Sequence, residues 1–126
     1  MLVPVSAGEV VDKITILEIK SEKISDKQKL KNIHTELTEL HKIWDNQVSS
    51  DSTLAAMISE LKKVNLLLWD IEDQIRIKES MKAFDQEFIE LARSVYVTND
   101  KRAALKRDIN MQLGSNLIEE KSYQDY

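Results

Sequence analysis

Polar residues in the middle of the sequence recur at a spacing that suits a ligand site. The stripe and its acidic neighbours are Asn65, Trp69, Asp70, Glu72, Asp73 and Arg76. Intervals of three and four residues place side chains on one face of a helix. The tryptophan can act as a stacking platform there, with the carboxylates and the arginine as polar hooks. A solvated helix face with one intrahelical Asp–Arg pair explains the same pattern, so both interpretations stay open.

A second stretch places charges where apolar residues are expected. In a continuous helix, Asn99, Arg102 and Lys106 fall on the line that joins Val95 to Ile109. An amide and two cations would then lie in the apolar seam, where buried charges need partners because they otherwise cost several kcal/mol. The candidate partners are Asp12, Glu18, Asp70, Glu72 and Glu79.

Two explanations of these charges are open. The first is a structural salt-bridge network that fixes helix register, or a kink that turns the charges outward. The second is a polar pocket for an anionic ligand, since forked guanidinium donors suit carboxylate and phosphate. Its positive charge would come from Arg93, Arg102, Lys106 and Arg107, and Tyr96 would add a hydroxyl. The candidate ligand-binding residues are therefore Asp12, Glu18, Asn65, Trp69, Asp70, Arg76, Arg93, Tyr96, Asn99, Arg102 and Lys106.

Other kinds of site find little support. The two histidines, His34 and His41, are seven residues apart, about 10.5 Å along a helix axis, which is too far to share one ion. The sequence has no cysteine, no Gly-rich phosphate loop and no nucleophile elbow. We therefore predict no metal, no cofactor and no catalytic residue, and an interaction protein rather than an enzyme.

Composition indicates the class of fold that must position these residues. The chain has 126 residues, of which only two are glycine and one is proline, and 42% are hydrophobic. Sheet folds need more turn residues than that, so we predict one all-α domain. The net charge of −4 argues against a nucleic-acid partner. No apolar run approaches the roughly 20 residues of a membrane span, so no membrane association and a cytoplasmic location are expected.

Apolar periodicity and capping residues divide the chain into elements. They predict four helices, over about residues 7–24, 26–46, 54–82 and 86–113. Ser6, Ser25 and Asp85 are the expected N-caps, and Gly114 is the expected left-handed C-cap. The last helix should continue through 98–100 with at most a kink. The predicted fold is an antiparallel bundle with two long helices, an extended lead-in over 1–8 and a partly ordered tail over 115–126.

Three parts of the chain look familiar as a set. They are residues 8–20, residues 65–76, and a third part that runs from 88–96 through 98–100 and 106–110 to 119–123. Together they resemble a family of short bacterial and phage proteins known as a domain of unknown function. The resemblance covers nearly the whole chain and implies a single-domain protein, but it brings no known reaction with it.

The first predicted helix suggests self-association. Its apolar residues, Val10, Val11, Ile14, Ile16, Leu17 and Ile19, cover more than one stripe. Because one helix–helix contact cannot bury them all, we predict an assembly module that forms a homodimer. One alternative is a binder of, or enzyme acting on, a small anionic metabolite in a polar pocket between helices. Another is an adaptor that binds a second protein through the acidic tail with Tyr123 and Tyr126.

Overall fold

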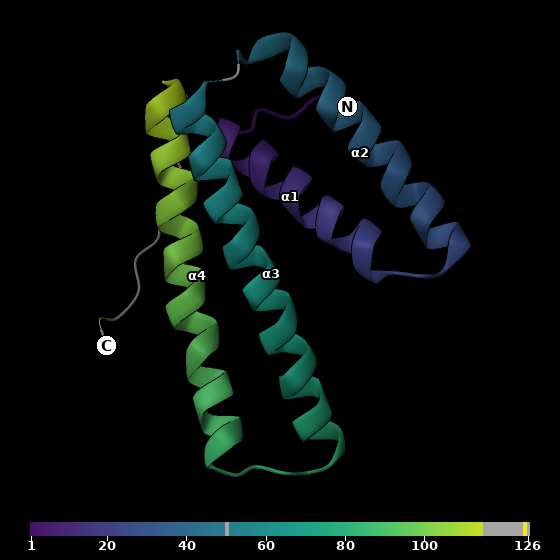
Figure 1. Ribbon diagram of the computed structural model, residues 1–126, viewed down its shortest axis with the longest axis vertical. Helices are drawn as coiled ribbons and strands as arrows, with labels where there is room; N and C mark the ends of the chain where they lie inside the picture. Colours follow the sequence, from purple (N-terminus) through teal and green to yellow (C-terminus); the bar gives the residue numbers. More distant parts are fainter. Residues whose placement is uncertain (50, 115–124, 126) are drawn as a thin grey trace.

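The described part of the protein folds into four helices and the short segments that join them. The computed structural model describes residues 1–49, 51–114 and 125. The helices are α1 (Ala7–Lys23), α2 (Lys27–Gln47), α3 (Ser52–Ser80) and α4 (Gln86–Leu113) (Figure 1). The described residues contain no strand. The predicted all-α fold with two long helices is therefore confirmed, whereas the predicted tail falls outside the described residues apart from Asp125.

Local capping bonds start the helices, mostly where the sequence indicates. The Ser6 hydroxyl accepts a hydrogen bond from the Glu9 amide at 3.2 Å, as expected. The prediction of Ser25 as the second cap is wrong by one residue. Asp26 takes that position, and its carboxylate accepts from the Lys29 amide at 2.9 Å. A charged carboxylate is the stronger acceptor for an unpaired helix amide, so the helix begins one residue later.

The last helix is continuous. Residues 98–100 lie inside α4, so no kink turns the charges of this helix away from the seam. Asp85 caps its first turn by accepting from the Phe88 amide at 2.9 Å. Gly114 closes its other end with a φ of 61°, a left-handed conformation in which other residues are strained. Both predicted caps of this helix are confirmed.

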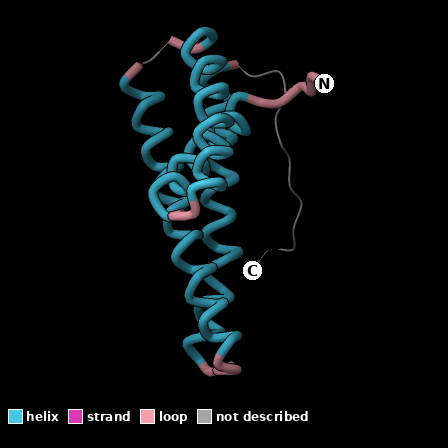
Figure 2. The backbone as a smooth tube through the Cα atoms, turned by 90° about the vertical axis from the view of Figure 1, so that its right-hand side faces the viewer, coloured by secondary structure: helices cyan, strands magenta, loops and turns pink. Residues whose placement is uncertain are grey.

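The helices form two hairpins of unequal length. α3 and α4 run antiparallel as a long hairpin, and α1 packs across one half of it, touching both helices (Figure 1). α2 returns along α1 (Figure 1). The other half of the long hairpin, which ends at the α3–α4 turn, extends beyond the two shorter helices (Figure 2). We call this half the distal hairpin.

α1 is the central helix of the molecule. Val11, Ile14, Leu17 and Ile19 are all buried within the chain, and Val11 joins a core cluster with Leu54, Leu61 and Ile109. Burying side chains of this size contributes about 1.5–3 kcal/mol each. The three neighbouring helices therefore cover most of the wide apolar surface of this helix, whereas Val10 and Ile16 are half-buried. This burial removes most of the surface from which the sequence predicted a homodimer, and the homodimer itself stays a prediction.

Candidate functional site

The carboxylate of Asp12 lies at the centre of a buried ion network. Asp12, on α1, is only 2% exposed. Arg102 of α4 binds both of its oxygens, with the Nε donating to Oδ1 at 2.9 Å and the Nη2 donating to Oδ2. Lys106, one turn further along α4, has its Nζ 2.8 Å from Glu9 Oε2 and 3.9 Å from Asp12 Oδ2. Both cations of the α4 seam are thus paired with carboxylates of α1.

Asn65 ties α3 into the same network. Its Nδ2 donates to Asp12 Oδ1 and to Thr15 Oγ1, each at 2.9 Å. The Thr15 hydroxyl donates its proton to the main-chain oxygen of Asp12, at 2.8 Å. Toward Asn65 its oxygen can therefore act only as a hydrogen-bond acceptor. This pattern determines the orientation of the Asn65 amide. One carboxylate and one amide therefore lock three helices together.

The two helices α1 and α4 approach closely at Gly8. Its amide donates to Asn110 Oδ1 at 2.6 Å. A Cβ atom at this position would lie 2.5 Å from the main-chain oxygen of Lys106 and 2.9 Å from Asn110 Oδ1. Only glycine therefore permits the crossing that brings Lys106 to its α1 partners.

A groove opens next to the network, where α1, α3 and α4 meet. Its volume is about 570 Å³. The lining residues are Ile16, Asn65, Leu68, Trp69, Glu72, Asp73, Arg76, Asn99 and Arg102. The polar stripe of α3 thus faces the polar residues of α4, and the two stretches singled out in the sequence lie at one place. Reasoning from sequence missed Ile16 and Leu68 as lining residues, because their helical spacing is also that of core residues.

The oxygen of the Asn65 side chain faces this groove. Asn65 is 5% exposed, and its Oδ1 accepts no hydrogen bond from any residue in the described part of the chain. Within that part, no fully buried side-chain oxygen or nitrogen lacks a partner. Oδ1 therefore retains access to solvent, and the opening that Asn65 lines is the groove.

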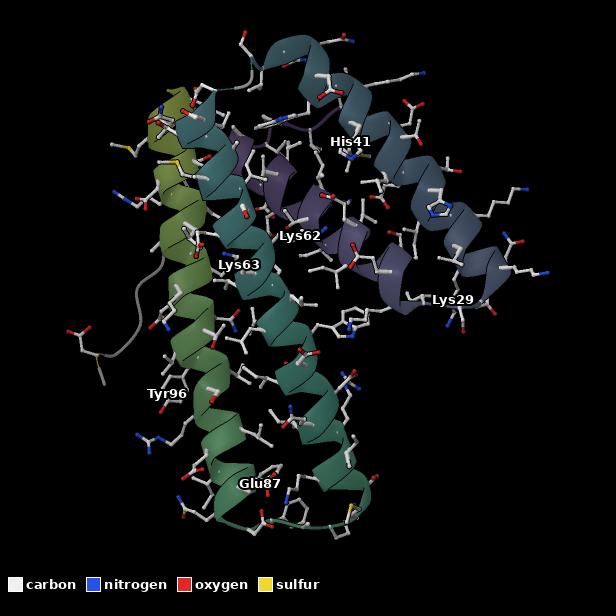
Figure 3. The ribbon with its side chains drawn as sticks, in the orientation of Figure 1. Lys29, His41, Lys62, Lys63, Glu87 and Tyr96 are labelled. Carbon is white, nitrogen blue, oxygen red and sulfur yellow. The ribbon has the colours of Figure 1, made fainter. Side chains whose placement is uncertain are left out.

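Four of the predicted site residues lie elsewhere. Asp70 is exposed on α3 and does not line the groove. Tyr96 projects from the side of α4 that faces away from α3 (Figure 3). A hydrogen bond from Arg93 to Tyr96 raises the pKa of the Arg93 guanidinium. Glu18 of α1 pairs instead with Lys62 of α3, with Lys62 Nζ 3.6 Å from Glu18 Oε2.

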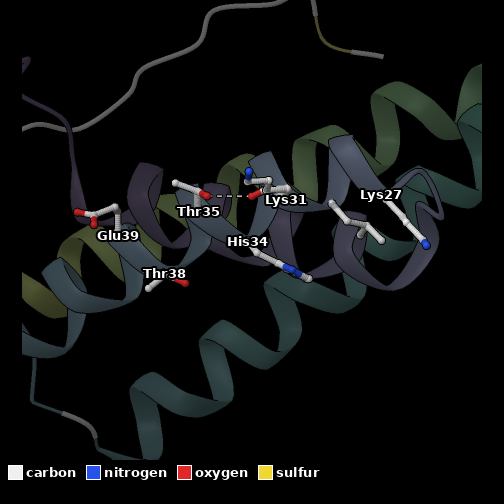
Figure 4. A pocket seen from close by; sticks show the side chains of 7 residues that line it. Lys27, Lys31, His34, Thr35, Thr38 and Glu39 are labelled. Atoms are coloured by element: carbon white, nitrogen blue, oxygen red, sulfur yellow. Dashed lines mark hydrogen bonds between the residues drawn. The ribbon is translucent and has the colours of Figure 1, made fainter.

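Two further depressions lie outside this region. One, of about 420 Å³, is bordered by Glu18, Trp44 and Lys62. The other, of about 650 Å³, is lined by α2 alone (Figure 4). There the Thr35 hydroxyl donates to the main-chain oxygen of Lys31 at 2.9 Å (Figure 4). Because one helix lines this depression, a ligand there would contact no second helix.

In residues 1–49, 51–114 and 125, no three acidic or histidine side chains converge as metal ligands would. No described helix combines the length and the apolar character that spanning a bilayer requires.

Comparison with known proteins identifies a family. The match to DUF6165 extends over residues 1–126. The chain belongs to this family. DUF6165 is described as a family of unknown function, so the resemblance seen in the sequence is confirmed to that extent. No curated protein and no solved structure matches the chain.

Proposed function

We propose that the protein is a helical assembly module that forms a homodimer through its distal hairpin. One observation carries the proposal. Four large apolar side chains near the α3–α4 turn are open to solvent: Ile77 is 57% exposed, Met81 68%, Phe84 56% and Ile89 47%. We call these four residues the distal patch. Contiguous exposed apolar surface on a protein usually marks an interaction site.

The fold itself leaves the distal patch uncovered. α1 and α2 pack at the other half of the long hairpin, so two helices alone form this end (Figure 2). The ring of Phe84 meets that of Phe88 edge to face, with centroids 5.2 Å apart. This contact orients an aromatic side chain that still exposes more than half of its surface.

A second copy of the chain is the partner that fits this end. Two antiparallel hairpins related by a two-fold axis would complete a four-helix arrangement, with each patch packed against its own copy. The charges at the turn do not oppose such contact, because they are paired within the chain. Lys78 Nζ lies 3.0 Å from Asp85 Oδ2 and 3.1 Å from Glu87 Oε2.

The oligomeric state tests the proposal. We expect the wild-type chain to be a dimer at tens of micromolar by sedimentation velocity or light scattering. The double variant Ile77→Lys, Ile89→Lys should be a monomer, because four lysines would face one another across the two-fold axis. The matched control is Leu67→Lys, which changes a similarly exposed α3 residue outside the patch and should remain dimeric. A monomeric wild type, or a dimeric double variant, would contradict the proposal.

A further inference from the structure

We propose that the groove between α1, α3 and α4 binds a neutral sugar. In this proposal the sugar ring stacks on Trp69. Its hydroxyls bind Asn65 at the floor and the carboxylates of Glu72 and Asp73 at the rim. The groove volume, about 570 Å³, falls within the range of about 300–1,000 Å³ in which small-molecule sites usually lie.

The Asn65 side chain provides a hydrogen-bond acceptor at the floor of the groove, where a ligand can donate. The Asn65 side chain is only 5% exposed. Its amide nitrogen donates one proton to Asp12 and the other to Thr15. Its Oδ1 is left without a partner among the described residues. Because this acceptor reaches solvent through the groove, a ligand hydroxyl that donates there takes the place of a water and completes the hydrogen bonding of Asn65. A hydroxyl group meets this need, whereas a carboxylate or phosphate oxygen does not.

The wall supplies a flat apolar surface. Trp69 is half-buried, and Leu68 and Ile16 lie beside it in the lining. Aromatic faces combine a large contact area with little loss of conformational entropy. The C–H face of a pyranose ring is apolar and flat on the same scale, so stacking on an indole shields it from water while the hydroxyls remain at the ring edge.

The rim supplies acceptors and a donor at the ring edge. The side chains of Glu72, Asp73 and Arg76 take part in no ion pair or hydrogen bond with any other described residue. Sugar hydroxyls both donate and accept, so they can satisfy the two carboxylates and the guanidinium together. The planar amide of Asn99 offers one more donor and one more acceptor.

The charge of the lining favours a neutral ligand over an anion. Two carboxylates and two guanidiniums line the groove. The charge of one guanidinium, that of Arg102, is neutralised by its ion pair with Asp12. Glu72 and Asp73 therefore outweigh Arg76, and the groove carries a small negative excess. This differs from the anionic ligand that the sequence suggests, because that prediction counted the cations of α4 without their α1 partners.

Tryptophan fluorescence tests the inference. The chain has two tryptophans, Trp44 and Trp69, so Trp44→Phe leaves the groove tryptophan as the only reporter. We expect a saturable change in its emission with at least one of glucose, galactose, mannose and N-acetylglucosamine, and none with inorganic phosphate. Calorimetric titration of the wild-type chain gives an independent reading in case Trp44→Phe fails to fold. Saturation by phosphate, or by none of the four sugars in both measurements, would overturn the inference.

Matched variants locate the binding. The double variant Glu72→Gln, Asp73→Asn alters exposed groove side chains and should weaken sugar binding about tenfold or more, as expected when strong acceptors for hydroxyls are lost. Asp70→Asn is the control, since Asp70 is an exposed neighbour that does not line the groove. Equal effects of the two changes would overturn the inference. Sugar binding should persist in the Ile77→Lys, Ile89→Lys chain, so it can succeed or fail independently of the proposed dimer.

Discussion

Among single residues, we expect replacement of Asp12 to lower the free energy of unfolding most. Its carboxylate is buried and accepts from both Arg102 and Asn65. Asp12→Asn would keep the shape of the side chain but leave two cations with too little negative charge. Removing one partner of a buried ion pair costs about 3–5 kcal/mol. We expect a loss of that size in the free energy of unfolding, measured by urea denaturation followed by circular dichroism.

An exposed ion pair between α1 and α2, next to Asp12 in the sequence, provides the control for this prediction. Lys13 Nζ lies only 2.6 Å from Glu36 Oε1, yet both side chains are largely exposed. Lys13→Gln should therefore cost less than about 1 kcal/mol, because exposed ion pairs contribute little. Similar losses for the Asp12 and Lys13 variants would show that the buried network is not structural.

Gly8 gives a prediction whose sign is unusual. Within a helix, replacing glycine by alanine normally stabilises by about 0.5–1 kcal/mol. At Gly8 the new Cβ would lie 2.5 Å from the main-chain oxygen of Lys106, and backbone atoms cannot move aside cheaply. We expect Gly8→Ala to destabilise by about 1–3 kcal/mol, as overpacking does. Thermal unfolding measures the change, and an increase in the melting temperature would mean that α1 and α4 are not in close contact there.

At the level of elements, the turn between α3 and α4 predicts a pH dependence. The pKa of Asp85 lies below its usual value, chiefly because its carboxylate accepts from the Phe88 amide and then because Lys78 is near. Its stabilising contribution is complete above about pH 3.9 and is lost as the pH falls through the lowered pKa. The pKa of Lys78 is raised by Asp85 and then Glu87, so its contribution is complete below about pH 10.4 and is lost above.

Asp85→Asn tests this dependence, because asparagine still caps the helix but carries no charge. The wild type should be more stable than the variant between about pH 4 and pH 10. The difference should shrink as the carboxylate is protonated at lower pH. Unfolding midpoints of the two chains across this range provide the measurement. A difference that stays constant down to pH 2 would be inconsistent with a charge effect.

The positions of the helices along the chain follow from local signals. Ser6, Asp85 and Gly114 act at the helix ends where their chemistry predicts. Each makes its bond within four residues, so the sequence alone contains both partners. Ser25 shows the precision of such reasoning. Two good capping residues stand side by side, and the choice of Asp26 depends on a small difference in acceptor strength.

At the level of the whole molecule, the two proposed activities occupy different places. The distal patch is formed by the end of the long hairpin, whereas the groove lies where α1 crosses it. A dimer formed at the patch makes the melting temperature rise with protein concentration, and a ligand in the groove adds to stability separately. Assembly and binding can therefore be measured one without the other.

The sequence by itself determined the helices and the two polar stripes of the groove. Asn65, Trp69 and Arg76 share a face because helical periodicity fixes the angle between them, and the same holds for Asn99 and Arg102. Continuity of α4 was favoured by its apolar spacing but not settled by the sequence, because Thr98, Asn99 and Asp100 could also cap a new helix. These properties depend on neighbours within a few residues.

Only the tertiary structure decided what each face meets. The rotation of one helix against another depends on packing over the whole interface, and no short stretch encodes it. The structure alone therefore shows that α1 is central, that Arg102 and Lys106 are paired with Asp12 and Glu9, and that Tyr96 faces away from α3. The sequence predicted a cluster of cations, whereas the groove in the structure has a nearly balanced charge. The carboxylate that neutralises Arg102 belongs to Asp12, which is ninety residues away in the sequence, so local spacing could not identify it.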